Sequence, residues 1–248
     1  LDFRNIPALA SCGQATTAVC DLGIAVISTG DEIVPAGKKN IEPGMIRDAN
    51  SFTIMANLAR AGFKSESLGI VPDDPEELQK AFNRALESFD VVILSGGSSV
   101  SSRDHSVLLL RELGKGELIV RGLNISPGKP TIVSGDAARK KLGICLPGHP
   151  HSCAVIASTF LVPLISSLIM GEAHDLFRKI HLPAGKDIVG KSGVEEFIPL
   201  KIGPMGEAMP LWAKSGFLLG MGNSDGLIRL PESTETLREG ADVEVWLW

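Results

Sequence analysis

The fold is decided by two stretches of the same design: residues 22–32, which read LGIAVISTGDE, and residues 91–104, which read VVILSGGSSVSSRD. In each stretch a short, unbroken apolar run ends in a polar loop that contains glycine. Unbroken apolar runs of this length are typical of strands that are buried on both faces, as in a parallel sheet covered by helices. The two stretches therefore predict neighbouring strands of such a sheet.

Four further apolar runs extend this pattern along the chain, at residues 67–71, 118–120, 131–133 and 142–146. Segments of helical period separate several of the runs. Alternation of strands and helices predicts an α/β fold, a three-layer α/β/α sandwich with a mostly parallel sheet. We assign this domain to residues 1–174 and expect the first 20 or so residues to be a remnant of a preceding domain.

Three segments have the features of helices. Residues 75–88 carry an apolar stripe and begin with proline, which suits a first helical turn. Residues 50–62 end at a glycine that predicts a stop. Residues 103–114 contain a natural N-cap, Asp104, and end at a second such glycine, Gly114. The stripe of the first segment consists of Leu78, Ala81, Phe82, Ala85 and Leu86, and the expected buried face of the second consists of Phe52, Met55, Leu58 and Ala59.

The pattern changes after about residue 172. Short alternating runs separated by glycine and proline replace the helical period, and they end in DVEVWLW at residues 242–248. There Val243 and Val245 share one face of a strand, whereas Glu244 and Trp246 share the other. We expect a second domain, a small β-barrel, over residues 175–248.

Composition excludes several classes of protein. The 248 residues contain 24 Lys and Arg against 29 Asp and Glu, a formal charge of -5, which argues against a general nucleic-acid-coating surface. The four cysteines form no C-x-x-C pair, so we expect a reducing, cytoplasmic location. The apolar stretch 153–170 contains serines and a proline and lacks flanking anchors. It therefore predicts a buried helix and not a membrane span.

Candidate ligand-binding residues follow the ends of the predicted strands, where ligands bind in open α/β sheets. Five loops that carry glycine or acidic residues should meet at one sheet edge. Their candidate residues are Thr29, Gly30, Asp31, Glu32, Asp73, Gly96, Gly97, Ser98, Ser99, Asp104, Lys129, Pro147, Gly148 and Ser152.

Each of these loops also has a plainer interpretation. The Gly96-Gly97 loop suits a phosphate, because backbone N–H groups and hydroxyls can donate to it, but it also suits an ordinary strand-to-helix turn. Asp73 and Asp104 could be simple N-caps. Asp31 and Glu32 add further carboxylates beside a phosphate loop, and a cation such as Mg²⁺ would be needed there to offset the repulsion. Lys129 could neutralise a phosphate or be solvated. The spacing of His149 and His151 makes them poor metal ligands.

Six motifs occur in the order and spacing of one known family. They are STGDEIV (28–34), IRDAN (46–50), GIVPDDPEEL (69–78), SGGSSVSSRD (95–104), PGKP (127–130) and LPGHPHS (146–152). The chain resembles the molybdopterin molybdenumtransferases, the MoeA-type proteins related to the gephyrin E domain. The likeness continues through KSG (214–216) and DGLIRLPE (225–232).

The resemblance implies an enzyme that binds adenylylated molybdopterin, inserts molybdate into it and releases AMP with help from Mg²⁺. It implies that Asp73 and Asp104 are the essential acids and position the cation. The other loop residues named above, together with Ser215, would form the pterin-phosphate pocket. It also implies a homodimer, with a molybdopterin adenylyltransferase as a possible partner and neither nucleic acid nor membrane.

Four positions depart from the family pattern, among them Ser101 in the phosphate loop, where glycine is usual, and His149 in LPGHPHS, where Asn or an aromatic residue is usual. A lysine usually precedes Pro-Gly-Lys-Pro, and this chain has Ser126; a second basic position is Gly122, beside Arg121. The lost cations favour one alternative, a pterin-binding carrier or sensor without transferase activity. A second alternative is an enzyme that uses the same domain type on another phosphorylated ligand, such as a molybdopterin adenylyltransferase, although the resemblance through the C-terminal residues argues against it.

Overall fold

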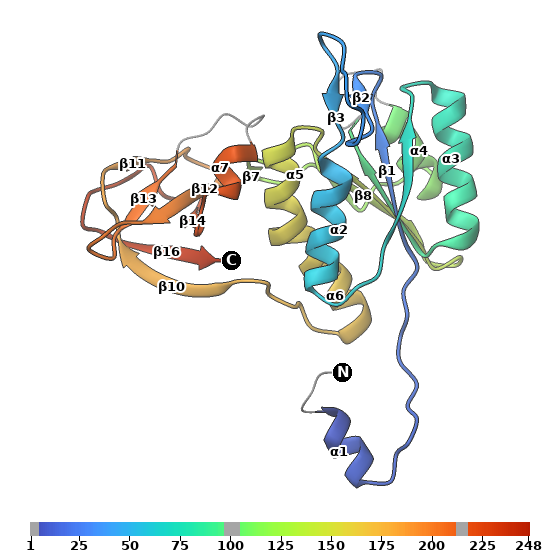
Figure 1. Cartoon of the computed structure of the whole chain (residues 1–248), viewed down its shortest axis with the longest axis horizontal. Coiled ribbons are helices and arrows are strands. Elements are labelled where there is room, and N and C mark those ends of the chain that lie inside the picture. Colours follow the sequence, from blue (N-terminus) through green and yellow to red (C-terminus); the bar gives the residue numbers. More distant parts are fainter. Residues whose placement is uncertain (1–4, 97–104, 212–217) are drawn as a thin grey trace.

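A computed structural model describes residues 5–96, 105–211 and 218–248, except for the side chains of residues 218 and 219. Its centre is a six-stranded sheet in the order β4-β1-β5-β9-β8-β6. The four strands from β4 to β9 are parallel, and β8 and β6 complete the sheet with antiparallel pairings. The prediction of a mostly parallel sheet is confirmed (Figure 1).

The elements of this first region alternate as predicted, with three short strands and one N-terminal helix in addition. The strands are β1 (Ile24–Thr29), β2 (Ile33–Val34), β3 (Ile46–Arg47), β4 (Glu66–Val71), β5 (Val91–Ser95), β6 (Val120–Arg121), β7 (Ile125–Ser126), β8 (Ile132–Asp136) and β9 (Lys141–Leu146). The helices are α1 (Asn5–Ser11), α2 (Asn50–Arg60), α3 (Pro75–Ser88), α4 (His105–Leu113), α5 (Pro150–Ile156), the π-helix η1 (Ala157–Leu161) and α6 (Val162–Met170). The strands β2, β3 and β7 and the helix α1 were not predicted.

Helices cover both faces of the central sheet (Figure 1). Ile24 and Val26 of β1 pack in one core with α2, α5 and α6, whereas Ala25 and Ile27 pack in a second core with α3 and α4. Successive side chains of a strand point to opposite faces, so an unbroken apolar run supplies both cores. The fold is therefore a three-layer α/β/α sandwich.

The predicted helical faces are confirmed for α3 and partly wrong for α2. In α3 the residues Leu78, Phe82, Ala85 and Leu86 are buried against the sheet. In α2 the buried residues are Asn50, Ser51, Ile54 and Leu58, whereas Phe52 is 57% exposed. The helix is rotated so that its polar first turn faces inward, because the side chains of Asn50 and Ser51 have hydrogen-bond partners there.

One helix among the described residues, Pro150–Met170, is long and apolar enough to cross a membrane. It packs inside the protein as predicted, with 56% of its most apolar window buried and with Val155, Ile156 and Leu161 in the first core. Pro163 lies just after the π-helical turn, where a wider turn accommodates a residue that lacks an N–H donor.

A second sheet follows residue 177. Its strands are β10 (Arg178–Pro183), β12 (Glu195–Ile202), β13 (Ala208–Pro210), β14 (Gly226–Leu230) and β16 (Asp242–Leu247); β11 (Ile188–Val189) pairs with β15 (Thr236–Leu237). The path β10-β16-β14-β12-β13 is antiparallel, and its two ends meet at one isolated bridge, Ala184–Ala208. A fully closed barrel stays a prediction. The short helix α7 (Leu218–Gly222) was not expected in this region.

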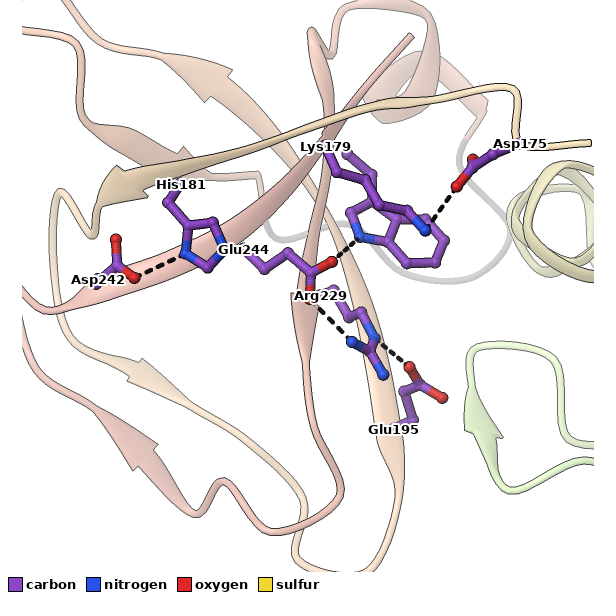
Figure 2. Close-up of polar contacts among 8 residues, drawn as sticks. Asp175, Lys179, His181, Glu195, Arg229, Asp242 and Glu244 are labelled. Carbon is purple, nitrogen blue, oxygen red and sulfur yellow. Dashed lines mark hydrogen bonds and ion pairs between the residues drawn. The ribbon is translucent and has the colours of Figure 1, made fainter.

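Aromatic residues of the second region pack against the first core and so connect the two regions. Trp246 of β16 packs 5.3 Å from Phe177 and 5.1 Å from Phe197, measured between ring centroids, and joins the first core. Figure 2 shows the polar network beside it, in which Arg229 pairs with Glu195 and Glu244. The domain division at residues 174 and 175 stays a prediction. Helix α1 has no buried residue and lies apart from both sheets (Figure 1).

Candidate functional site

The candidate site begins where β1 and β4 end side by side. The hydroxyl of Thr29 donates to Asp73 Oδ1 at 2.7 Å, and the backbone N–H of Asp73 donates to Asp31 Oδ1 at 3.1 Å. The register pairs Thr29 with Val71, so the two loops leave the sheet together. Asp31, Glu32 and Asp73 are exposed. The structure thus joins residues 42 positions apart in one polar cluster.

The plainer interpretation of Asp73 as a helix cap is wrong. The N-cap of α3 is Asp74, whose Oδ1 accepts the backbone N–H groups of Glu76 at 3.0 Å and Glu77 at 2.9 Å. Asp73 therefore does not cap helix α3. Its Oδ1 accepts the Thr29 hydroxyl, and among the described residues no hydrogen bond reaches its Oδ2.

Two glycine loops close on the same edge. A Cβ atom at Gly96 would lie 2.3 Å from the carbonyl oxygen of Thr29, so only glycine permits the end of β5 to approach the end of β1 this closely. Gly148, after β9, lies beside Gly96: a Cβ atom there would be 3.4 Å from Gly96 Cα. Backbone groups of three strand ends therefore gather within one small area.

A buried carboxylate ties this area to α2. Asp48 accepts the hydroxyl of Ser28 at 2.8 Å, the hydroxyl of Ser51 at 2.7 Å and the N–H of Ser51 at 3.1 Å. Next to it, Asn50 Nδ2 donates to the carbonyl oxygen of Gly148 at 2.8 Å. Asp48 and Asn50 thus connect the β1 end with the β9 loop. Sequence reasoning assigned them no role, although they lie in the IRDAN motif directly before a helix.

The start of α5 is buried and polar. Pro147 and Ser152 are buried, as is His151, whose side-chain nitrogens have no hydrogen-bond partner among the described residues. Burial lowers the pKa of His151 below its ordinary value of 6.5, because the charged imidazolium loses solvation. Burial also raises the pKa of the Cys153 thiol to about 12. Neither group is poised to carry charge at neutral pH.

The Pro-Gly-Lys-Pro turn lies at the same sheet edge, on the side of β8 and β6. β6 is antiparallel to β8, which is antiparallel to β9, so the end of β6 and the start of β8 lie with the end of β9. The Ser126–Pro127 bond is cis, and a Cβ atom at Gly128 would lie 2.2 Å from Ile156 Cδ1 of α5. Lys129 is exposed at the tip of this turn.

Five of the predicted site residues lie outside the described residues: Gly97, Ser98, Ser99, Asp104 and Ser215. Within the described ranges, no group of three or more His, Cys, Asp or Glu side chains could hold a metal ion by itself. A Mg²⁺ site needs fewer protein ligands than that, because Mg²⁺ commonly binds one or two carboxylates together with substrate phosphates. The linked Asp73 and Asp31 fit that mode.

Comparison with known proteins agrees with this architecture. Residues 25–167 match the family described as a probable molybdopterin binding domain, and residues 181–248 match the MoeA C-terminal region, domain IV. Two matches thus cover the α/β sandwich and the second sheet separately.

Individual relatives extend along nearly the whole chain. A molybdopterin biosynthesis protein of Methanocaldococcus jannaschii is 32% identical over 96% of this chain and 58% of its own length. The molybdopterin molybdenumtransferase of Haemophilus influenzae is 36% identical over 66% of this chain and 40% of its own. The crystal structure of a MoeA protein from Pyrococcus horikoshii superposes with a TM-score of 0.79 and 31% identity, covering all of this chain and 60% of that one.

The chain therefore spans about 58% of the length of the M. jannaschii relative. Both matched regions occur here in one chain. The chain belongs to the MoeA family, as a molybdopterin-binding domain followed by a MoeA C-terminal region.

Proposed function

We propose that this chain acts in molybdenum cofactor synthesis, binding adenylylated molybdopterin and inserting molybdate with release of AMP. The observation that carries the proposal is the cluster Thr29–Asp73–Asp31 beside the Gly96 and Gly148 loops, at the carboxyl edge of a sheet that matches a molybdopterin-binding family. Curated relatives bearing the molybdopterin molybdenumtransferase name support the reaction class.

The edge has an acidic end and a basic end. Asp31, Glu32 and Asp73 are exposed after β1 and β4, whereas Lys129 is exposed before β8. From β1 to β8 there are three neighbouring strand pairs, roughly 14 Å at the usual strand spacing. An extended ligand with phosphates at the acidic end and an oxyanion at the basic end suits this spacing.

The acidic end is where we propose Mg²⁺ to act. Anionic phosphates next to three carboxylates repel them unless a cation lies between. When bound, Mg²⁺ would neutralise the phosphoanhydride that is cleaved. The protein's own contribution is to hold the Asp73 carboxylate in place through the Thr29 hydroxyl, with Asp104 as a second proposed acid.

The other loop residues would bind the ligand. The Gly96, Gly97, Ser98 and Ser99 loop would donate to phosphate, and Pro147, Gly148, Ser152 and Ser215 would line the pterin pocket. Further proposals are a homodimer, delivery of substrate by a molybdopterin adenylyltransferase, and a cytoplasmic location.

Neighbouring aspartates provide a matched test. We expect Asp73→Asn to abolish AMP release from adenylylated molybdopterin in the presence of molybdate and Mg²⁺, with unchanged thermal unfolding. Asp74→Ala should lower the free energy of unfolding by about 1 kcal/mol through the lost N-cap and leave AMP release nearly unchanged. Equal activity of Asp73→Asn and the unsubstituted chain would refute the assignment.

A second candidate is a pterin-binding module without transfer activity, favoured by Ser126 and Gly122 where relatives carry basic residues. Calorimetry with molybdopterin separates the two. Binding without any AMP release in the parallel assay would support the module, whereas AMP release would exclude it.

A further inference from the structure

A lysine from the C-terminal region contacts the residue that precedes the Pro-Gly-Lys-Pro turn, at the basic end of the sheet edge. Lys191, in the loop between β11 and β12, donates from Nζ to Ser126 Oγ at 3.0 Å. The same ammonium lies 2.9 Å from Glu196 Oε1. Ser126 directly precedes the Pro-Gly-Lys-Pro turn, so Lys191 contacts the residue next to the turn that carries Lys129, although the two lysines are 62 positions apart in the chain.

The backbone holds this approach in place. β7 pairs in parallel with the start of β12, with Ile125 opposite Glu195 and Ser126 opposite Glu196. Asn124 Nδ2 donates to the carbonyl oxygen of Gly193 at 2.6 Å, and the backbone N–H of Lys191 donates to Glu196 Oε2 at 2.7 Å. The loop that carries Lys191 is therefore fastened at both ends.

The ammonium retains donor capacity toward solvent. A lysine has three N–H donors, and Ser126 and Glu196 occupy two of them. The Lys191 side chain is 67% exposed, whereas its carboxylate partner is almost fully buried. Because Ser126 Oγ accepts from Lys191, its own O–H is left to donate. The segment thus offers a charged donor and a neutral donor to one bound anion.

We propose that Lys191 is a binding residue for a tetrahedral oxyanion, contributed to the sheet edge by the C-terminal region. The inference rests on the proposed function, in which molybdate is the incoming oxyanion. The phosphate of the pterin has the same shape and charge type. Titration with molybdate alone and with inorganic phosphate alone therefore distinguishes the two sources.

Charge and hydrogen bonding can be separated at this position. In calorimetric titrations of the whole chain, we expect Lys191→Gln to weaken oxyanion binding about tenfold, the usual effect of one charge-assisted bond in a partly exposed site. Lys191→Arg should bind within threefold of the unsubstituted chain. The control is Lys80→Gln, because Lys80 is 68% exposed and paired with Glu77 on the outer helix α3; it should leave binding unchanged.

A purely structural role makes a different prediction. If the Lys191–Glu196 pair only fastens the loop, Glu196→Gln should weaken binding or leave it unchanged. If Lys191 binds the anion, Glu196→Gln should tighten binding several-fold, because the competing carboxylate charge is removed. Unaltered oxyanion affinity in Lys191→Gln, or no oxyanion binding by the unsubstituted chain, would overturn the inference.

The outcome is independent of turnover. Should the chain bind molybdate and release no AMP, the proposed transferase activity fails, yet the comparison of Lys191→Gln with Lys191→Arg still decides the role of Lys191. Should AMP be released while both variants bind molybdate equally to the unsubstituted chain, the inference fails alone.

Discussion

Replacing Gly96 by alanine tests whether the β1 and β5 ends must touch. The added Cβ would lie 2.3 Å from the carbonyl oxygen of Thr29, and the residue has a φ of +108°. Gly116 has a similar φ of +101° with nothing within 4 Å of its Cβ position. Both substitutions incur the strain of a positive φ, about 1–2 kcal/mol. Only Gly96→Ala also forces two strand ends apart.

The size of the difference follows from the contact. Real Cβ contacts are rarely shorter than 3.0 Å, so the Thr29 carbonyl and residue 96 must separate by several tenths of an ångström. Overpacking of this kind costs about 1–3 kcal/mol. We therefore expect Gly96→Ala to lower the free energy of unfolding by about 2–5 kcal/mol, against about 1–2 kcal/mol for Gly116→Ala.

Urea unfolding followed by circular dichroism measures both variants, and molybdopterin calorimetry measures the consequence for the site. Because Thr29 holds Asp73, displacement of its backbone should also weaken pterin binding in Gly96→Ala and not in Gly116→Ala. Equal losses of stability in the two variants would show that the loops can accommodate a Cβ atom at residue 96 and that the close approach of β1 and β5 is not required.

Three further predictions concern buried polar groups. Asp48→Ala should lower the free energy of unfolding by about 2–4 kcal/mol and weaken pterin binding, because Ser28 and Ser51 lose their buried acceptor. The control is the exposed Asp242, whose replacement by alanine should lower the free energy of unfolding by less than about 1 kcal/mol. Urea unfolding measures both variants. Because the pKa of His151 is below 6.5 in the folded chain, the unfolded chain binds more protons below about pH 6.5, and the free energy of unfolding should decline there by up to ~1.4 kcal/mol per pH unit. His151→Leu should flatten that slope in unfolding curves recorded from pH 8 to 5. An unchanged slope would contradict burial of His151 as its cause. Iodoacetamide at pH 8 should modify the exposed Cys12 and Cys20 in the folded chain, whereas Cys153, buried with a thiol pKa of about 12, should react only after unfolding, as read by peptide mass spectrometry.

Much of the fold was predictable because its signals are local. The apolar runs at 22–28 and 91–94 correspond to β1 and β5, and the stripe of residues 75–88 corresponds to the buried face of α3. The face of α2 was not predictable in the same way. Phe52 is more apolar than Asn50 and Ser51, yet those two are buried because Gly148 and Asp48 supply hydrogen-bond partners from elsewhere in the chain.

The candidate site shows the same division. Strand ends of a parallel sheet meet at one edge, so the convergence of the loops after β1, β4, β5 and β9 followed from the order of the elements. The choice between Asp73 and Asp74 as the cap of α3 did not, because both precede the proline that begins the helix. The backbone direction at that point, and the Thr29 hydroxyl on the next strand, decide it.

The sequence by itself determined the α/β class, the buried apolar helix predicted at 153–170 and the set of loops that share an edge, since each depends on periodicity and on residues close in the chain. Only the tertiary structure decided that Asp73 meets Thr29 and Asp31, that Asp48 and Asn50 fasten two loops, and that Lys191 reaches Ser126. These contacts join residues far apart in the chain. Their existence depends on strand register and helix rotation, which the packing of the whole molecule sets.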